Sequence, residues 1–164
     1  MDVYVLRHGK AGPPAGAAGD NGRTLTREGK KEIRGIAKAM QGQKFRFDAI
    51  ATSPLPRAKE TAAIVARALG QKDRVAVWDE LAPGGDADTV CYRAAQYDAD
   101  ASILICGHEP ALSSLVSRIV AGRDDASIVL TKGGLAKIRN YRFDHQPSGE
   151  LQWLLTSKQL MAMR

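Results

Sequence analysis

The chain of 164 residues, with 44% hydrophobic and 26% charged residues, suits a single folded domain over residues 1–164. Its apolar runs stay short of the roughly 18 residues that a membrane span needs, and no secretory leader precedes the first strand, so we expect a cytoplasmic protein that does not bind membranes. The net charge of +6 suits an acidic partner, but aromatic residues make up only 5%, which argues against nucleic-acid binding.

The first predicted strand covers residues 3–6, a continuous apolar run typical of a parallel strand that is buried on both faces. This strand leads directly into the string Arg7-His8-Gly9. Residues 9–22 are rich in Gly, Ala and Pro, which predicts a flexible loop beside that string.

A helix is expected after Thr26, which can cap it, because apolar residues follow at helical spacing. They are Ile33, Ile36, Ala37 and Met40. A second strand is predicted over residues 47–51. A second helix is expected to start sharply after this strand, with Ser53 as its N-cap and Pro54 in the first helical position. Gly70 is expected to end this helix.

Two more strand-and-helix units are predicted in the second half of the chain. Residues 75–78 form a short strand before a turn-rich loop, and a helix follows at about residues 88–97. Residues 103–106 form the most clearly buried strand, which leads into Gly107 and His108. The helix after it carries an apolar stripe of Leu112, Leu115, Val116 and Ile119.

In the last part of the chain, consecutive strands replace the alternation of strands and helices. They are expected over residues 127–130, 135–143 and 151–155, with a hairpin turn at residues 146–149. Strands that alternate with helices and end in a hairpin predict an α/β fold, a three-layer α/β/α sandwich around a mostly parallel central sheet.

Four basic side chains are expected to meet at one edge of this sheet. His8 and His108 each follow a buried strand directly, and the carboxyl end of a parallel sheet is where ligands bind. Arg7 adjoins the first histidine, and Arg57 lies in the first turn of its helix, where the helix dipole already favours an anion. Planar guanidinium groups suit phosphate oxygens, and a neutral imidazole can attack phosphorus. The residues alone leave open which histidine attacks.

Other phosphate chemistries lack their signatures in this sequence. No P-loop string is present, and neither Cys91 nor Cys106 has an arginine six positions later, as a cysteine phosphatase would. Both cysteines are expected to be reduced core residues. The three histidines lie far apart without metal-ligand spacing, so we expect neither a metal nor another cofactor.

The motifs together resemble the histidine phosphatase superfamily, the phosphoglycerate-mutase-like proteins, and within it the SixA-like phosphohistidine phosphatases. The general motifs are Leu6-Arg7-His8-Gly9, Ser53-Pro54-x-x-Arg57-Ala58-x-x-Thr61-Ala62 and Gly107-His108. The strings that favour the SixA-like group are Arg23-x-Leu25-Thr26-x-x-Gly29 and Glu80-Leu81-x-Pro83-x-Gly85-Asp86. The resemblance covers residues 1 to about 155.

This resemblance implies that His8 is the nucleophile and forms a phosphohistidine intermediate, which water then hydrolyses. It implies that Arg7, Arg57 and His108 hold the phosphoryl oxygens. Gly9 and Glu109, which adjoin the two histidines, are expected to complete the phosphate-binding set.

Two carboxylates are candidates for a general acid. Glu80 stands where larger members carry a catalytic glutamate, although Leu81-Ala82-Pro83 departs from their pattern. Asp20 matches an acid of the SixA-like group. Each has a purely structural alternative, Glu80 as a loop charge or a helix-flanking anion and Asp20 as an ion-pair partner of Arg7.

The resemblance suggests a metal-independent phosphatase that acts on phosphohistidine of a protein partner, in signal transduction. No segment is long enough to form a separate lid, and an open pocket admits a macromolecular substrate. The alternatives are a broad phosphomonoesterase for small metabolites and a non-catalytic module that binds a phosphoryl group.

Overall fold

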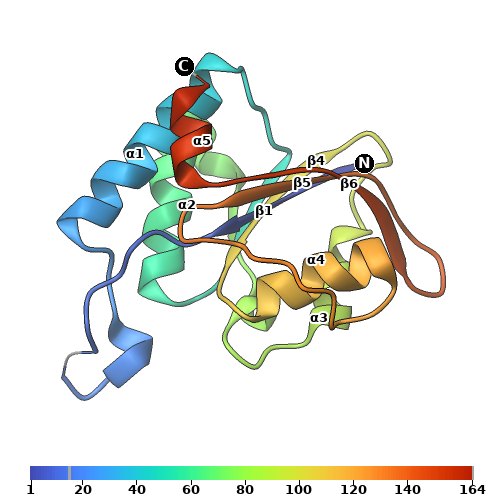
Figure 1. Cartoon of the computed structure of the whole chain (residues 1–164), viewed down its shortest axis with the longest axis horizontal. Helices are drawn as coiled ribbons and strands as arrows, with labels where there is room; N and C mark the ends of the chain where they lie inside the picture. The colour runs from blue at the N-terminus through green and yellow to red at the C-terminus, as the bar shows by residue number, and fades with distance from the viewer. Residues whose placement is uncertain (15, 164) are drawn as a thin grey trace.

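A six-stranded sheet forms the centre of the computed structural model, which describes residues 1–14 and 16–163 (Figure 1). The strand order is β3-β2-β4-β1-β5-β6. The strands are β1 (Asp2–Arg7), β2 (Ala49–Thr52), β3 (Val75–Val77), β4 (Ser102–Gly107), β5 (Leu135–Phe143) and β6 (Pro147–Leu155). Strands β1 to β4 pair with one another in parallel, whereas β5 is antiparallel to both β1 and β6, so the predicted mostly parallel sheet is confirmed.

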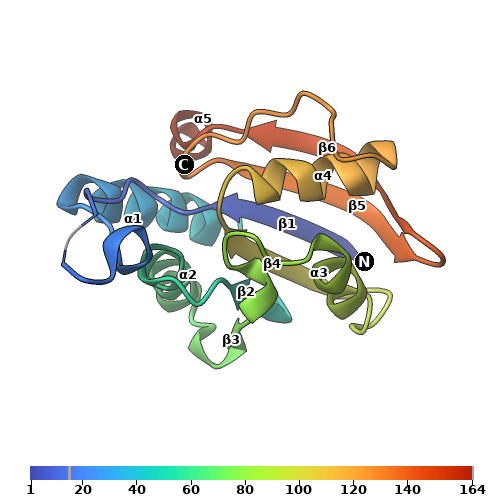
Figure 2. The same cartoon turned by 90° about the horizontal axis from the view of Figure 1, so that it is seen from below.

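Helices cover both faces of the sheet and complete the predicted three layers (Figures 1 and 2). The α-helices are α1 (Arg27–Gly42), α2 (Pro56–Leu69), α3 (Ala87–Ala94), α4 (Ala111–Ala121) and α5 (Ser157–Ala162). Helices α1, α2 and α5 pack on one face, and α3 and α4 pack on the other. Three short 3₁₀ helices lie between them, η1 (Gly19–Gly22), η2 (Lys72–Arg74) and η3 (Asp79–Leu81).

The two central strands are buried on both faces, as their unbroken apolar sequences predict. In β1, Val5 packs with the core beneath α3 and α4, whereas Leu6 packs with the core beneath α1 and α2. The partner strand β4 repeats this alternation in register, because Val5 pairs with Ile105 and Leu6 with Cys106. Alternate side chains of each strand thus pack against the helices on opposite faces of the sheet. This packing fixes the register of β1 and β4, and with it the place where both strands end.

A capping threonine explains where α1 begins and a proline in the first helical position suits the start of α2, with one correction to the sequence prediction. Thr26 caps α1, as predicted, by accepting a hydrogen bond from the Gly29 N–H at 3.0 Å. Helix α2 starts two residues later than predicted, at Pro56 with Leu55 as its N-cap, so the prediction that Ser53 caps the helix was wrong. Gly70 ends α2 with a φ of 69°, as predicted.

The C-terminal part of the chain differs from the prediction in three places. Residues 127–130 form no strand, and the Leu130 carbonyl instead accepts a hydrogen bond from an arginine of the site described below. Pro147 already belongs to β6, which places the hairpin turn at residues 144–146. Helix α5 was not predicted, and its start is a capping box formed by Thr156 and Gln159.

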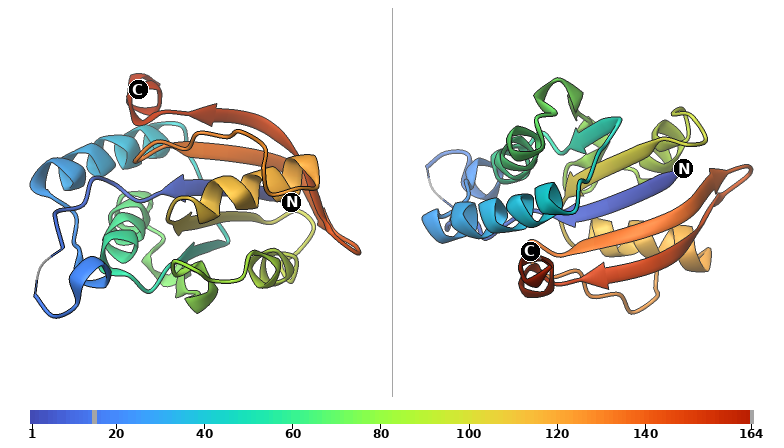
Figure 3. Two further views of the ribbon diagram at one scale, coloured as in Figure 1. Left: turned by 60° about the horizontal axis from the view of Figure 1, so that its bottom comes forward. Right: turned by 90° about the horizontal axis from the view of Figure 1, so that it is seen from above.

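Both cysteines are free and buried, as predicted, Cys91 in α3 and Cys106 in β4. In the part of the chain that the structure describes, no helix combines the length and apolar character needed to cross a membrane. The loop between β1 and α1 extends beyond the carboxyl end of β1 (Figure 3). Position 15 of the predicted flexible loop lies outside the described residues.

Candidate active site

Three neighbouring strands end at the same edge of the sheet and deliver the predicted residues to one place. Arg7 of β1 pairs with Gly107 of β4, so His8 and His108 leave the sheet side by side. Their imidazole ring centroids are 5.0 Å apart. The third strand, β2, ends at Thr52 opposite Cys106, which brings Ser53 to the same edge.

The imidazole of His8 is held in one tautomer. Its Nδ1 lies 2.7 Å from the carbonyl oxygen of Gly9, and a carbonyl can only accept a hydrogen bond, so Nδ1 carries the proton. The lone pair is therefore on Nε2. Gly9 is fixed in turn, because its N–H donates to Thr61 Oγ1 at 3.2 Å and a Cβ at this position would lie 2.7 Å from Ile33. Both polar groups of the Gly9 backbone thus serve to position His8.

The environment of His8 favours the neutral imidazole. Burial is the main cause that lowers its pKa to about 4, and the charges of Arg57 and Arg7 add to it, while the hydrogen bond to Gly9 opposes the shift. At neutral pH the ring is unprotonated on Nε2 and can act as a nucleophile.

His108 is oriented by Ser53, whose Oγ lies 2.8 Å from Nε2. The Ser53 oxygen already accepts a hydrogen bond from the Leu55 N–H, so its hydroxyl proton is free to be donated to His108. This assignment leaves the proton of the neutral His108 on Nδ1, which is buried without a partner. Burial, followed by the charges of His8 and Arg57, lowers the pKa of His108 to about 3.

Arg57 lies in the first turn of α2 and is only 4% exposed. Its two terminal nitrogens bond Asp20, one to the backbone oxygen at 2.7 Å and one to the carboxylate at 3.0 Å. Its Nε is buried and has no partner. A buried guanidinium beside a helix N-terminus is a strong attractor for an anion.

Arg7 is held by residues 127–130, which were predicted to form a strand. One terminal nitrogen donates to the carbonyl oxygen of Leu130 at 2.9 Å. The Arg7 backbone bonds Gly133 and Gly134, which fixes its direction at the end of β1. Its Nε is also buried without a partner.

Asp20 in η1 connects the loop to the site. Its carboxylate bonds Arg23 at 2.8 Å as well as Arg57. The hydrogen bond from Arg23, and then the charge of Arg57, hold the pKa of Asp20 below its ordinary value. Asp20 is therefore an ionised counter-ion of Arg57 and Arg23 in this structure.

The structure does not bring two other predicted residues to this cluster through their side chains. Glu80 accepts hydrogen bonds from Arg93 of α3 with both carboxylate oxygens, and Arg93 lies over the ring of Trp78. The carboxylate of Glu109 accepts from the backbone and hydroxyl of Ser113 and so stabilises the start of α4. In the described residues, no hydrogen bond or ion pair joins either carboxylate to the arginines or histidines of the site.

Sequence reasoning missed four parts of the site, namely Ser53, Thr61, Arg23 and the Leu130 carbonyl. Ser53 and Thr61 were both within the quoted motif, and their short spacing from Arg57 was the available signal. Their roles depend on contacts across the sheet edge, which a sequence does not display. A backbone carbonyl such as that of Leu130 leaves no signal in the sequence at all.

Unsatisfied nitrogens show what the cluster can bind. Among the described residues, the buried side-chain nitrogens and oxygens without a hydrogen-bond partner are Arg7 Nε, Arg57 Nε and His108 Nδ1. An unpaired buried polar group costs roughly 1–3 kcal/mol, and a bound oxyanion would remove that cost by accepting from such donors. The described residues contain no group of three His, Cys, Asp or Glu side chains that could hold a metal ion.

Comparison with known proteins agrees with this geometry. The model of the histidine phosphatase superfamily (branch 1) matches residues 3–83. The phosphohistidine phosphatase SixA of Escherichia coli strain K12 is 30% identical over 158 residues, which cover 95% of this chain and 94% of that protein.

Two solved structures have the same fold. The protein histidine phosphatase SixA complexed with tungstate superimposes with a TM-score of 0.84 at 29% identity and covers 98% of this chain and 99% of that one. A phosphoserine phosphatase from Entamoeba histolytica superimposes with a TM-score of 0.69 at 16% identity, over 97% of this chain and 98% of that one. The chain therefore belongs to the histidine phosphatase superfamily and is one of its SixA-like members.

Proposed function

We propose that this phosphatase removes the phosphoryl group from phosphohistidine on a partner protein, with His8 as the nucleophile. The observation that carries the proposal is the set of three unsatisfied buried nitrogens around a neutral His8. They supply donors for phosphoryl oxygens beside a free imidazole lone pair. The similarity to a SixA bound to tungstate, a tetrahedral oxyanion, supports a phosphoryl site.

In the first step, His8 Nε2 attacks phosphorus and a new P–N bond forms. The P–N bond to the substrate imidazole breaks, and its electron pair stays on the departing nitrogen. Arg7, Arg57 and His108 donate hydrogen bonds to the phosphoryl oxygens, whose arrangement changes as the group transfers. Preorganised donors of this kind stabilise a transition state without reorganisation.

In the second step, water attacks the phosphorus of phosphorylated His8. The P–N bond breaks, its electron pair returns to Nε2, and the water proton is taken up by the phosphate or by solvent. Inorganic phosphate leaves and neutral His8 is restored. The hydrogen bond from Nδ1 to the Gly9 carbonyl is retained throughout, which keeps the ring oriented.

The state of the two candidate acids favours phosphohistidine over an alkyl phosphate as substrate. An alkoxide leaving group needs a proton, whereas an imidazole with a pKa near 6.5 leaves once its other nitrogen is protonated in solution. Asp20 is ionised between Arg57 and Arg23, and Glu80 is bound to Arg93. Neither carboxylate is set up to donate a proton, and a phosphohistidine substrate does not require one.

Rapid quench with labelled phosphohistidine protein tests the proposal. We expect a phosphoenzyme that is labile in acid and stable in alkali, as a phosphoramidate is. The His8→Ala variant should give no label, whereas His108→Ala should still be labelled at a rate lowered ~10²-fold. His145→Ala is the matched control, because His145 is an exposed residue of the β5–β6 turn and should behave as wild type.

Two results would overturn the assignment. Labelling of His8→Ala equal to wild type would exclude His8 as the nucleophile. Hydrolysis of small phosphomonoesters with a much higher kcat/KM than phosphohistidine protein would replace the proposed substrate with a small metabolite.

A further inference from the structure

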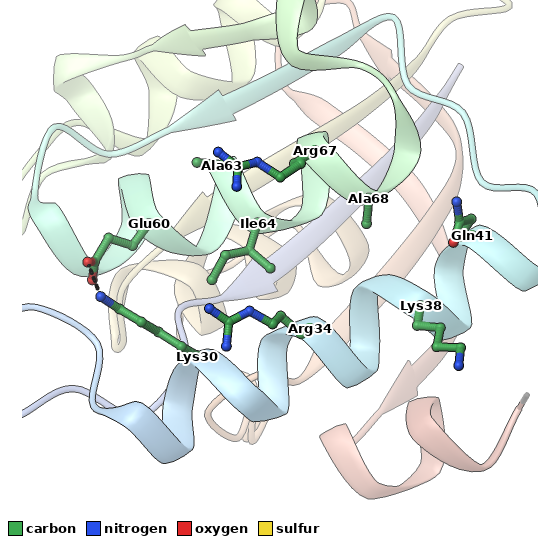
Figure 4. A pocket seen from close by; sticks show the side chains of 9 residues that line it. All are labelled: Lys30, Arg34, Lys38, Gln41, Glu60, Ala63, Ile64, Arg67 and Ala68. Carbon is green, nitrogen blue, oxygen red and sulfur yellow. Dashed lines mark ion pairs between the residues drawn. The ribbon is translucent and has the colours of Figure 1, made fainter.

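A groove of about 540 Å³ lies between α1 and α2, outside the residues that form the catalytic site (Figure 4). One wall carries Lys30, Arg34 and Lys38, which follow one another at four-residue intervals along α1. The other wall, formed by α2, carries Arg67 and Glu60. Four cations thus face a single carboxylate, which makes this groove strongly basic.

Most of this positive charge is not neutralised within the chain. Lys30 pairs with Glu60 at 2.7 Å and closes one end of the groove. Arg34, Lys38 and Arg67 form no ion pair within the described part of the chain, and all three are exposed. The guanidinium groups of Arg34 and Arg67 extend from facing helices toward the Lys30–Glu60 end (Figure 4).

The floor between the two basic walls is apolar. Ile64 lies between Arg34 and Arg67, and Ala63 and Ala68 extend the apolar strip along α2 (Figure 4). Ile64 and Ala68 are only half-buried, so an apolar side chain of a partner could remove them from water. An apolar floor between cationic walls matches a ligand that is apolar along its centre and acidic on both sides.

The groove also adjoins the catalytic site. Glu60 precedes Thr61, which holds Gly9 and through it the nucleophile. The carboxylate of Glu60 accepts a hydrogen bond from the Leu25 N–H at 2.6 Å, at the end of the loop that carries Asp20. A segment bound in the groove would therefore have one end next to the loop that borders the site.

We propose that this groove docks an acidic amphipathic helix of the phosphohistidine-bearing partner, an inference that rests on the proposed function. From Lys30 to Lys38 the α1 wall rises about 12 Å, which matches two turns of a bound helix. Carboxylates spaced four residues apart on that helix would face the α1 cations, and an apolar residue would pack on Ile64. No aromatic side chain lines the groove to stack a base, so an acidic protein suits it better than a nucleic acid.

The test compares three substrates that share the same chemistry. They are free phosphohistidine, a 20-residue helical peptide with one phosphohistidine and Glu at every fourth position around a Leu strip, and the same peptide with Gln in place of each Glu. Wild type should hydrolyse the Glu peptide with the highest kcat/KM. The double variant Arg34→Glu/Arg67→Glu should lose tenfold or more of that kcat/KM, through KM, and keep its activity on free phosphohistidine.

Lys72→Glu/Lys158→Glu is the matched control. Both lysines are exposed, lie outside the groove and form no ion pair in the described residues, and each double variant changes the formal net charge from +6 to +2. Long-range attraction alone would lower the activity of both double variants equally. We expect the control to lose less than threefold.

Fluorescence anisotropy with the unphosphorylated Glu peptide separates docking from catalysis. If wild type hydrolyses none of the three substrates, the proposed function fails, and peptide binding that is lost only in Arg34→Glu/Arg67→Glu still supports the groove. Equal losses in both double variants, or no preference of wild type for the Glu peptide, would overturn the docking proposal while hydrolysis stands. Groove-dependent binding of a duplex RNA without binding of the peptide would also overturn it.

Discussion

The Oγ of Ser53 lies 2.8 Å from Nε2 of His108, and this contact determines which nitrogen of the histidine carries its proton. Ser53 is fully buried and directly follows β2, whereas His108 directly follows β4. We assign the hydroxyl as the donor to Nε2, because its oxygen already accepts from the Leu55 N–H and its proton remains available for the imidazole nitrogen. His108 Nδ1 is therefore the donor available to a phosphoryl oxygen.

Replacing Ser53 with Ala should lower kcat about tenfold with little change in KM. Without the hydroxyl, His108 can rotate and can carry its proton on either nitrogen, so the Nδ1 donor is no longer fixed in place. Steady-state kinetics on phosphohistidine protein would measure this loss. Ser117→Ala is the control, since Ser117 of α4 is equally buried and its hydroxyl donates to the backbone carbonyl of Arg123, away from the site. Equal losses of kcat in both variants would indicate a general structural effect instead.

The sequence predicted most of the strands, and the meeting of His8 and His108 at one sheet edge, because both depend on local signals. Buried parallel strands are continuous apolar runs, and His8 and His108 follow them directly. The start of α2 was misplaced because Ser53 and Pro54 fit a helix cap on propensity alone. In the folded protein the Ser53 hydroxyl instead bonds a histidine from another strand.

Other differences between the prediction and the structure have the same physical origin. Residues 127–130 have the composition of a strand, but the Leu130 carbonyl accepts from Arg7, and this long-range contact was invisible in the sequence. The prediction that Glu80 and Glu109 join the site relied on their positions in motifs. Their carboxylates have nearer partners, Arg93 and Ser113, that only the fold reveals.

The two site histidines should make the protein less stable as the pH falls. Their pKa values are about 4 and 3 in the folded state and near 6.5 when unfolded, so below pH 6.5 the unfolded chain binds more protons. Each histidine then lowers the free energy of unfolding by up to about 1.4 kcal/mol for every pH unit below 6.5. This loss continues down to about pH 4 for His8 and about pH 3 for His108. Urea unfolding at pH 7.5, 6.5, 5.5 and 4.5 would measure this slope.

His8→Gln should make this pH dependence shallower by about one histidine's share, because glutamine does not titrate. His145→Gln is the matched control variant, because His145 is exposed in the β5–β6 turn and lies outside the site. Parallel stability curves for wild type and His8→Gln would contradict the lowered pKa of His8.

Activity should be independent of divalent metal ions. Two buried or half-buried arginines can balance the phosphoryl charge without a metal ion, and neutral His108 can donate a hydrogen bond to it. We expect dialysis against a strong chelator to leave kcat/KM on phosphohistidine protein unchanged. Loss of activity that is restored by added Mg²⁺, Mn²⁺ or Zn²⁺ would show that a metal takes part.

The last prediction concerns Asp20, whose carboxylate bonds the same arginine that is proposed to hold the substrate. Asp20→Asn should lower KM and leave kcat on phosphohistidine protein nearly unchanged, because the ionised carboxylate competes with the phosphoryl oxygens for Arg57. A general acid would behave differently, with a kcat loss of about 10²-fold on alkyl phosphate esters, whose leaving groups need a proton. Measuring kcat and KM for both substrates distinguishes the two roles. Glu80→Gln serves as the matched carboxylate variant, and since Glu80 is bound to Arg93 it should alter neither parameter by more than about twofold. A large and equal fall in kcat on both substrates in Asp20→Asn would identify Asp20 as an obligatory acid and would shift the proposed substrate toward phosphomonoesters.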